Sequence, residues 1–259
     1  MHLVASPPQV LAHLRRRRPS SRLYAVGWSQ GGNILINHMG VAGEGCLLHA
    51  AMAVSPAMDP AAIDAHFHGT VKGRLYRGVI LGPLLGYYLR HRAAMGYSAI
   101  QVLRGFATGR FFESLAVPLG HYGRGEGGMA AYHREATSAA RVGQVRTPLL
   151  VVASEDDPIV PLASLPLAEM EANPSIVTAV TRHGGHMGYT AGLSPLRHTW
   201  VDRVLVHCLQ HWLRQPADAA SSDAPAAAGP AEADAAEAAA AGGGCALHPD
   251  PPAILRSRL

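Results

Sequence analysis

The feature that most constrains the fold of this chain is a short apolar run that ends in a glycine-flanked serine. Residues 23–26 favour a strand, and a helical pattern of apolar residues begins at Asn33. Between them lies the sequence Gly27-Trp28-Ser29-Gln30-Gly31-Gly32. A strand, a sharp turn and a helix in this order are typical of a G-x-S-x-G nucleophile elbow, in which a strained turn lifts the serine above the end of a sheet. We therefore predict that Ser29 is a nucleophile.

A chain of this length with this glycine and serine content contains the G-x-S-x-G pattern by chance about 0.2 times, so the pattern alone is weak evidence. Its place between a strand and a helix raises it well above that background. The pattern also predicts that the neighbouring backbone leaves no room for a Cβ at Gly27 or Gly31. The backbone N–H of Gln30 is then expected to be one donor of an oxyanion hole.

Further strand and helix patterns extend along the chain. Residues 49–55, 149–153 and 175–181 favour strands, and residues 200–213 have apolar side chains at helical spacing. The uninterrupted apolarity of 149–153 is typical of a parallel strand buried on both faces. Strands that alternate with helices predict an α/β fold, a mainly parallel sheet with helices on both faces.

Composition divides the chain into a folded part and a tail. We predict one partial domain over residues 1–214 and a disordered tail over 215–259, which is dominated by Ala, Pro, Gly, Ser, Asp and Glu as far as about residue 246. Within the domain, the loosely patterned, tyrosine-bearing segment 57–146 is expected to be a cap over the site. Its most apolar stretch, residues 79–89, is about half the length of a membrane span and predicts a buried or interfacial helix.

A serine nucleophile needs a base and an acid that orients the base. Asp157 follows the strand 149–153 and stands four residues before Pro161, so we predict that it is the acid, with Asp156 as the alternative. A solvated acidic turn is the competing explanation of this loop. His186 follows the strand 175–181, and two glycines before it allow the backbone to turn, so we predict that His186 is the base. The order Ser29, Asp157, His186 is the order of α/β-hydrolases.

Other histidines offer weaker alternatives. His183 and His186 could form an H-x-x-H metal pair, but the glycines between them disfavour a helix and no third ligand is close in sequence. His66 and His68 also lack a clear partner. We therefore predict no metal, and we expect the remaining histidines to be surface or packing residues.

The overall composition narrows the class of partner and the compartment. The formal net charge of +4 owes much to the arginines at 15–18, for which a solvated helix end is favoured over contact with lipid headgroups. The chain has no interleaved aromatic and basic pattern, which argues against nucleic acid. Its three isolated cysteines argue against disulfides or a zinc knuckle, and its first residues lack a secretory signal. An intracellular location is favoured over secretion, and localisation and oligomeric state stay open.

Three segments together resemble one branch of the α/β-hydrolase superfamily, the abhydrolase-domain proteins that include YheT-like esterases and plant embryogenesis-associated proteins. The segments are Gly27-Trp28-Ser29-Gln30-Gly31-Gly32-Asn33, residues 153–161, and Gly184-Gly185-His186-Met187-Gly188-Tyr189. The resemblance covers about residues 19–213. It implies an α/β-hydrolase fold and a cofactor-free carboxylesterase or lipase that acts on acyl esters, including acylglycerols and phospholipids, with peripheral membrane association left open.

The chain departs from that family before the elbow. Only 28 residues precede Ser29, whereas a complete member has several strands there and a loop that supplies a second oxyanion donor. We therefore expect an N-terminally truncated domain that lacks at least three core strands. The leading hypothesis is a serine hydrolase of lipid-like esters, and acyl transfer to an alcohol is a variant of it. The alternative is a catalytically incompetent remnant that binds a lipid or a protein, and Ser29-dependent ester hydrolysis would discriminate between them.

Overall fold

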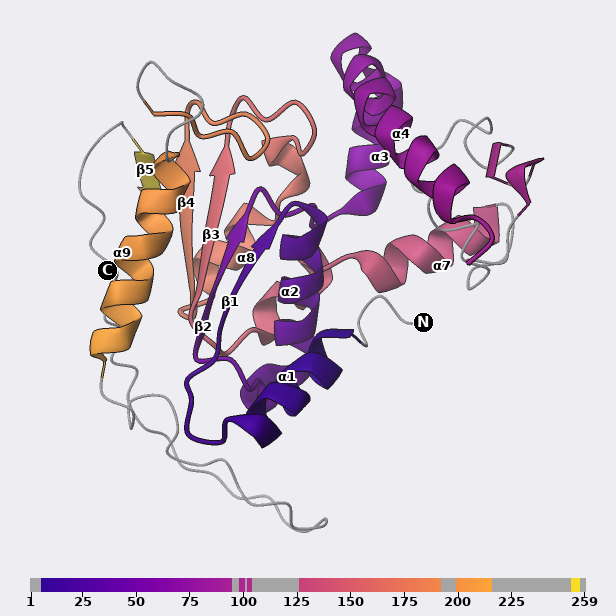
Figure 1. Cartoon of the computed structure of the whole chain (residues 1–259). Coiled ribbons are helices and arrows are strands. Elements are labelled where there is room, and N and C mark those ends of the chain that lie inside the picture. The colour runs from indigo at the N-terminus through magenta and orange to yellow at the C-terminus, as the bar shows by residue number, and fades with distance from the viewer. Residues whose placement is uncertain are drawn as a thin grey trace.

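A computed structural model describes residues 6–94, 98–100, 102–103, 126–191, 199–215 and 253–256 (Figure 1). The α-helices are α1 (Ser6–Arg17), α2 (Gln30–Ala42), α3 (Pro60–Gly69), α4 (Val71–His91), α7 (Glu126–Ala136), α8 (Leu167–Ala172) and α9 (Trp200–Arg214). Short 3₁₀ helices are η1 (Gly43–Gly45), η3 (Ala139–Gln144) and η4 (Leu162–Ser164). The strands are β1 (Tyr24–Trp28), β2 (Ala50–Val54), β3 (Leu149–Ser154), β4 (Ile176–Thr181) and β5 (Ala253–Arg256).

The described strands form one sheet in the order β1-β2-β3-β4-β5. Strands β1 to β4 run parallel, and their register aligns Val26 with Met52 and Val54 with Val152. The predicted strands are confirmed to within two residues at each end. Because parallel strands end at the same edge of a sheet, the segments that follow β1, β3 and β4 meet there. All three catalytic residues predicted from the sequence lie in those segments.

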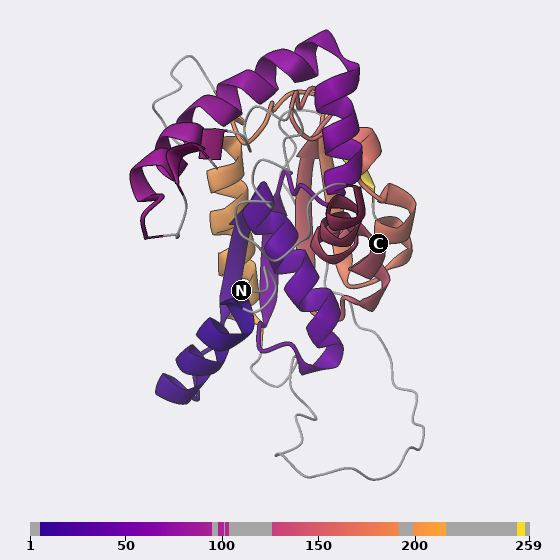
Figure 2. The same ribbon diagram turned by 90° about the vertical axis from the view of Figure 1, so that its right-hand side faces the viewer.

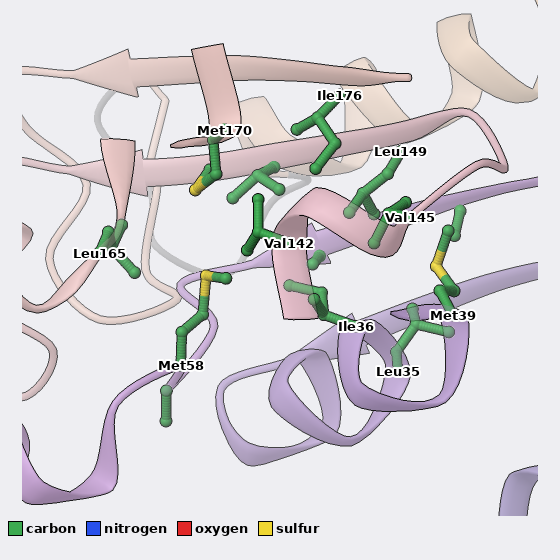
Figure 3. Close-up of a cluster of buried hydrophobic side chains, with 14 of the residues drawn as sticks. Leu35, Ile36, Met39, Met58, Val142, Val145, Leu149, Leu165, Met170 and Ile176 are labelled. Carbon is green, nitrogen blue, oxygen red and sulfur yellow. The ribbon is translucent and has the colours of Figure 1, made fainter. Parts of the chain in front are cut away.

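Helices cover both faces of the sheet, as the sequence predicts (Figure 1). Side chains on a strand alternate between faces, so Ala51 and Ala53 belong to a core cluster that α2 and α8 complete. Met52 and Val54 belong to a second cluster, which α9 completes with Cys208 and other apolar side chains. Figure 3 shows part of the first cluster, in which α2, η3 and β3 pack together. The mainly parallel sheet with helices on both faces is confirmed.

Helix α9 shows how local sequence sets an element boundary. The hydroxyl of Thr199 accepts the N–H of Asp202, and the carboxylate of Asp202 accepts the N–H of Thr199. This reciprocal capping box satisfies two N–H groups that the first helical turn leaves without partners. Val201 and Val204 then face the sheet with Cys208. The predicted helix at 200–213 is confirmed as Trp200–Arg214.

The described part of segment 57–146 contains α3, α4, α7 and η3 (Figure 2). Its two ends lie side by side, because the carbonyl of Met58 accepts the N–H of Ser138 and the hydroxyl of Thr137. Asn33 on α2 joins them, since its amide donates to the carbonyl of Ala136. Residues 95–97, 101 and 104–125 lie outside the described residues. That this segment is a cap stays a prediction.

Helix α4 contains the apolar stretch 79–89. Only Gly73 and Tyr88 on this helix are buried, and Val79 is 63% exposed. The structure therefore does not support a fully buried helix, and an interfacial helix stays a prediction. Across the part of the chain that the structure describes, we find no helix with the length and apolarity needed to span a membrane.

The predicted disordered tail, 215–259, lies mostly outside the described residues. Within it, Ala253–Arg256 form β5, which pairs antiparallel with β4 and aligns Ile254 with Val180. These four residues therefore differ from the prediction. The physical reason is that the edge of β4 offers backbone hydrogen-bonding groups, and a segment with Ile254 and Leu255 is a better strand former than the alanine-rich run before it.

Candidate active site

The turn between β1 and α2 holds Ser29 in a strained conformation. Its backbone has φ 49° and ψ −118°, a region that non-glycine residues rarely adopt. Such strain costs about 1–3 kcal/mol and persists only where the surroundings hold it. Here the N–H of Ser29 donates to the carbonyl of Val54 at 2.8 Å, and its carbonyl accepts the N–H of Ala57 at 3.2 Å. The end of β2 and the residues after it therefore stabilise the elbow.

The glycines around Ser29 have different roles. A Cβ at Gly27 would lie 2.6 Å from the carbonyl oxygen of Gly31, too close for any side chain there. A Cβ at Gly32 would lie 3.0 Å from the Cβ of Pro56, whereas a Cβ at Gly31 would meet nothing within 4 Å. The prediction that lack of space explains both motif glycines is right for Gly27 and wrong for Gly31. On α2 the close approach is made by Gly32, one residue further along, which packs against Pro56.

The structure brings Ser29, His186 and Asp157 into one chain of hydrogen bonds. Nε2 of His186 lies 2.8 Å from Oγ of Ser29, and Nδ1 lies 2.8 Å from Oδ2 of Asp157. The His186 side chain is 7% exposed and the Asp157 side chain 2% exposed. Residues separated by 157 positions in sequence are therefore in direct contact, shielded from water.

The carboxylate decides how protons are arranged in this chain of contacts. An ionised Asp157 can only accept hydrogen bonds, so Nδ1 of His186 carries the proton that it donates. In a neutral imidazole Nε2 is then the acceptor, and the Ser29 hydroxyl donates to it. This arrangement can remove the proton from Ser29 as its oxygen attacks an electrophile, and Asp157 stabilises the imidazolium that forms.

The loop after β3 fixes the orientation of Asp157. Its Oδ1 accepts the N–H groups of Ile159 and Val160 at 2.8 and 2.9 Å, which leaves Oδ2 for His186. The short spacing before Val160 and Pro161 is thus what lets the backbone turn back onto the carboxylate. Of the two candidate acids, Asp157 is the one that contacts the imidazole.

Asp156 supports the opposite loop. Its Oδ1 accepts the N–H groups of Gly184 and Gly185 at 3.0 and 2.8 Å, and its Oδ2 lies 3.4 Å from Nδ1 of His183. Burial by itself raises the pKa of Asp156, but hydrogen bonds, first among them that from the N–H of Gly185 and including that from the N–H of Gly184, outweigh it and hold the pKa below its ordinary value. Asp156 therefore anchors the loop that carries His186.

The His186 loop is tied to the sheet at several further points. The hydroxyl of Ser154 donates to the carbonyl of Gly185 at 2.8 Å, and the N–H of Tyr189 donates to the carbonyl of Gly184 at 2.8 Å. Gly185 has φ 57°, as the predicted glycine turn requires. A Cβ at Gly184 would lie 2.5 Å from the Tyr189 ring, so this glycine is needed for packing. These contacts place the imidazole over the end of the sheet.

Tyr189 and Ser55 form a buried pair that sequence reasoning missed. Their hydroxyls lie 3.1 Å apart, and both residues have positive φ, 41° and 45°. Burial raises the pKa of Tyr189 to about 12, since the phenolate would be poorly solvated. The signal in the sequence was slight: a tyrosine after Gly188, and a serine as the last residue of the predicted strand 49–55. Nothing local indicates that the two touch.

The remaining predicted residues lie as follows. Gln30 is the first residue of α2, so its N–H has no acceptor within the helix. Nε2 of His66 on α3 lies 3.0 Å from the carbonyl of Pro158, and His68 lies 3.8 Å from Asp64. His183 contacts Asp156. Among the described residues, no three His, Cys, Asp or Glu side chains gather closely enough to hold a metal ion.

Comparison with known proteins gives distant relatives. The chain is 28% identical over 205 residues to embryogenesis-associated protein EMB8 of Picea glauca, covering 78% of this chain and 45% of that protein. It is 25% identical over 203 residues to phospholipase ABHD3 of Homo sapiens, covering 78% of this chain and 49% of that protein. No protein-family model matches the chain. The chain thus spans about half the length of the curated relatives it matches.

A solved structure supports the fold. A puromycin-hydrolysing peptidase of Mycobacterium tuberculosis superposes with a TM-score of 0.50 at 15% identity, covering 81% of this chain and 25% of that chain. At this identity the likeness concerns the fold alone.

Proposed function

Because this chain is a member of the α/β-hydrolase superfamily, we propose that it hydrolyses carboxylic esters with lipid-like acyl groups, with Ser29 as its nucleophile. The observation that carries the proposal is the chain of contacts from Ser29 through His186 to Asp157. Two 2.8 Å hydrogen bonds, buried and in the order that nucleophilic catalysis needs, have no simple purpose in stability alone.

In the proposed reaction Oγ of Ser29 attacks the ester carbonyl while Nε2 of His186 takes the hydroxyl proton. Collapse of the tetrahedral intermediate breaks the ester bond, and His186 passes the proton to the departing alcohol. Water then attacks the acyl group on Ser29 and loses a proton to His186. The bond between the acyl carbon and Oγ of Ser29 breaks, His186 returns the proton to Oγ, and the carboxylic acid is released. The N–H of Gln30 is the proposed donor to the oxyanion, a role whose removal typically costs about 10²–10³ in turnover.

The proposed substrate is a lipid ester. The name of the human relative, a phospholipase, supports this class. We further propose that residues 1–214 form the catalytic domain, with residues 57–146 as its cap and residues 215–259 as a tail, of which Ala253–Arg256 pair with β4. Product analysis with water and an added alcohol as competing acceptors distinguishes hydrolysis from acyl transfer.

The test is covalent labelling and turnover of the 259-residue chain. A fluorophosphonate probe, which reacts with activated serines, should label the chain, and Ser29→Ala should abolish both labelling and hydrolysis of p-nitrophenyl butyrate. His186→Ala should have nearly the same effect, because it removes the base.

The matched control is His183→Ala, which changes an exposed histidine three residues away on the same loop. It should keep at least half of the hydrolysis. Equal labelling of the Ser29→Ala variant, or turnover that does not depend on Ser29, would overturn the proposal.

A further inference from the structure

Helix α4 exposes a row of apolar side chains along one face. Val71 is 84% exposed, Leu75 67% and Val79 63%, and their spacing of four residues places them on consecutive turns. Single exposed apolar residues are ordinary on protein surfaces, but a row along one helix marks a surface that is covered in use.

The opposite side of α4 holds the helix on the protein. Ile80, Leu81 and Leu84 pack against the main core cluster, and Tyr88 is buried. Thr70 caps the first turn by accepting the N–H of Gly73 at 2.8 Å. The exposed row is therefore the outer face of a docked, capped helix.

Positive charge lies at both ends of this face. Lys72 and Arg74 stand in the first turn, and Arg90 and Arg92 stand at the end of the helix, all of them exposed. Residues 71–92 contain neither Asp nor Glu. An apolar strip between cations matches the surface of an anionic bilayer, where lysine and arginine reach phosphates while apolar side chains enter the acyl boundary.

Helix α4 lies on the same side of the molecule as the candidate active site. It follows α3 directly, and His66 on α3 contacts the carbonyl of Pro158, the residue after Asp157. Figure 2 shows α4 running across the end of the molecule that lies opposite α1. A bilayer surface in contact with α4 would therefore also face the carboxyl edge of the sheet.

We propose that the exposed face of α4, defined by Val71, Leu75 and Val79 with the flanking cations, binds the surface of an anionic phospholipid bilayer. The helix has 21 residues, or about 31 Å at 1.5 Å per residue, and lies in the plane of the headgroups. A second copy of α4 is a poor occupant, because both of its ends carry the same charge and repel in either orientation. The proposal is independent of hydrolysis and is tested without turnover.

The experiment is flotation of the 259-residue chain with vesicles of phosphatidylcholine alone or with 30 mol% phosphatidylglycerol added, at about 0.1 M salt. The chain should float with the anionic vesicles and bind neutral vesicles at least tenfold more weakly. Leu75→Ser/Val79→Ser should lower binding about tenfold. Lys72→Gln/Arg74→Gln should lower it by at least tenfold on anionic vesicles only.

Two control variants separate this surface from others. Val206→Ser removes a half-exposed valine from α9, and Arg16→Gln/Arg17→Gln neutralises the basic end of α1, at the other end of the sheet (Figure 1). Both should bind vesicles like the unchanged chain. Circular dichroism and thermal unfolding should be alike for all variants. If Leu75→Ser/Val79→Ser has lost its fold, the milder single change Val79→Ser replaces it.

The outcomes that overturn the proposal are distinct. They are no flotation with anionic vesicles, flotation that Leu75→Ser/Val79→Ser leaves intact, or flotation that depends on α1 instead. The proposal would also be overturned if the chain formed a dimer in lipid-free solution and Leu75→Ser/Val79→Ser dissociated it, since a second copy would then cover α4. Loss of ester hydrolysis on its own bears only on the proposed function.

Discussion

The loops at the carboxyl edge of the sheet and the outer face of α4 differ in how far their side chains are in contact with the rest of the chain. In the loops, both oxygens of Asp157 and both ring nitrogens of His186 have partners within the chain. On α4, Val79 and its apolar neighbours face outward, without cover. Contacts within the chain thus position the proposed reaction centre, whereas the outer face of α4 is the surface that we propose binds a bilayer.

The loops also separate two adjacent carboxylates. Asp157 contacts His186, while Asp156 accepts N–H groups from the loop that carries it. One carboxylate therefore acts on the imidazole directly and the other through backbone. This contrast implies that substitutions in the loops lower activity or stability strongly, whereas substitutions on the outer face of α4 barely change activity on soluble esters. The following predictions test both expectations.

The largest effect is expected for Asp157→Asn. The amide can donate to Nδ1 and so favours the wrong tautomer of His186, and turnover of p-nitrophenyl butyrate should fall about 10³–10⁴-fold. Steady-state kinetics measure this as a loss in kcat with KM little changed. A loss below tenfold would contradict the role of Asp157.

The elbow should tolerate no side chain at Gly27. Gly27→Ala places a Cβ against the carbonyl of Gly31, so the free energy of unfolding should fall by about 3 kcal/mol in urea titrations. Gly31→Ala is the matched control, because nothing lies within 4 Å of its Cβ, and it should leave stability unchanged or raise it by up to about 1 kcal/mol. Equal losses in the two variants would contradict the packing described for the elbow.

The raised pKa of Tyr189 leads us to expect that the folded state loses stability at alkaline pH. Its pKa is raised from about 10 to about 12, so the folded state holds a proton that the unfolded state releases. The stabilisation is complete below pH 10 and is lost as pH rises toward 12, by on the order of 2 kcal/mol.

Urea titrations at several pH values measure this loss of unfolding free energy. Tyr189→Phe should reduce the loss, whereas Tyr87→Phe, which changes an exposed tyrosine of α4, should keep it. The same alkaline slope in the Tyr189→Phe variant would show that the buried hydroxyl is not its source.

Asp156→Asn should have a smaller effect on turnover than Asp157→Asn. The amide oxygen still accepts N–H groups, but without the charge that strengthens them, so we expect kcat to fall about tenfold. The pKa of Asp156 is lowered in the folded state, so its contribution to stability is present above about pH 4 and is lost as pH falls through its folded pKa. Asp156→Asn should flatten this acid limb in urea titrations. A kcat loss as large as that of Asp157→Asn would contradict the separate, indirect role assigned to Asp156.

The smallest effect is expected on the outer face of α4. Leu75→Ser/Val79→Ser should change kcat/KM for soluble p-nitrophenyl butyrate by less than about twofold, because exposed side chains away from the site contribute little to it. A tenfold loss on this soluble ester would mean that α4 acts on the reaction centre itself.

Much of the candidate site could be predicted from sequence because its parts are local. Ser29 sits in a strand, turn and helix that a few consecutive residues specify, and His186 follows a pair of glycines at the end of a strand. The choice of Asp157 over Asp156 rested only on spacing before Pro161. Adjacent residues point in different directions, so the curve of the backbone after β3 was needed to assign each carboxylate a partner.

Other features could not be predicted because they join distant segments. Ser55 and Tyr189 are 134 positions apart, and no local pattern links them. The space beside Gly31 depends on how α2 lies against β1, and the pairing of β5 depends on the free edge of β4.

The sequence by itself determined the α/β class, the parallel strands, the elbow and the order of Ser29, Asp157 and His186, because each is written in short-range patterns of apolarity, glycine and polar residues. The tertiary structure decided which carboxylate meets the imidazole, what anchors its loop, and which face of α4 is left open. These depend on contacts between segments far apart in the chain, and their geometry is set only when the helices pack on the sheet.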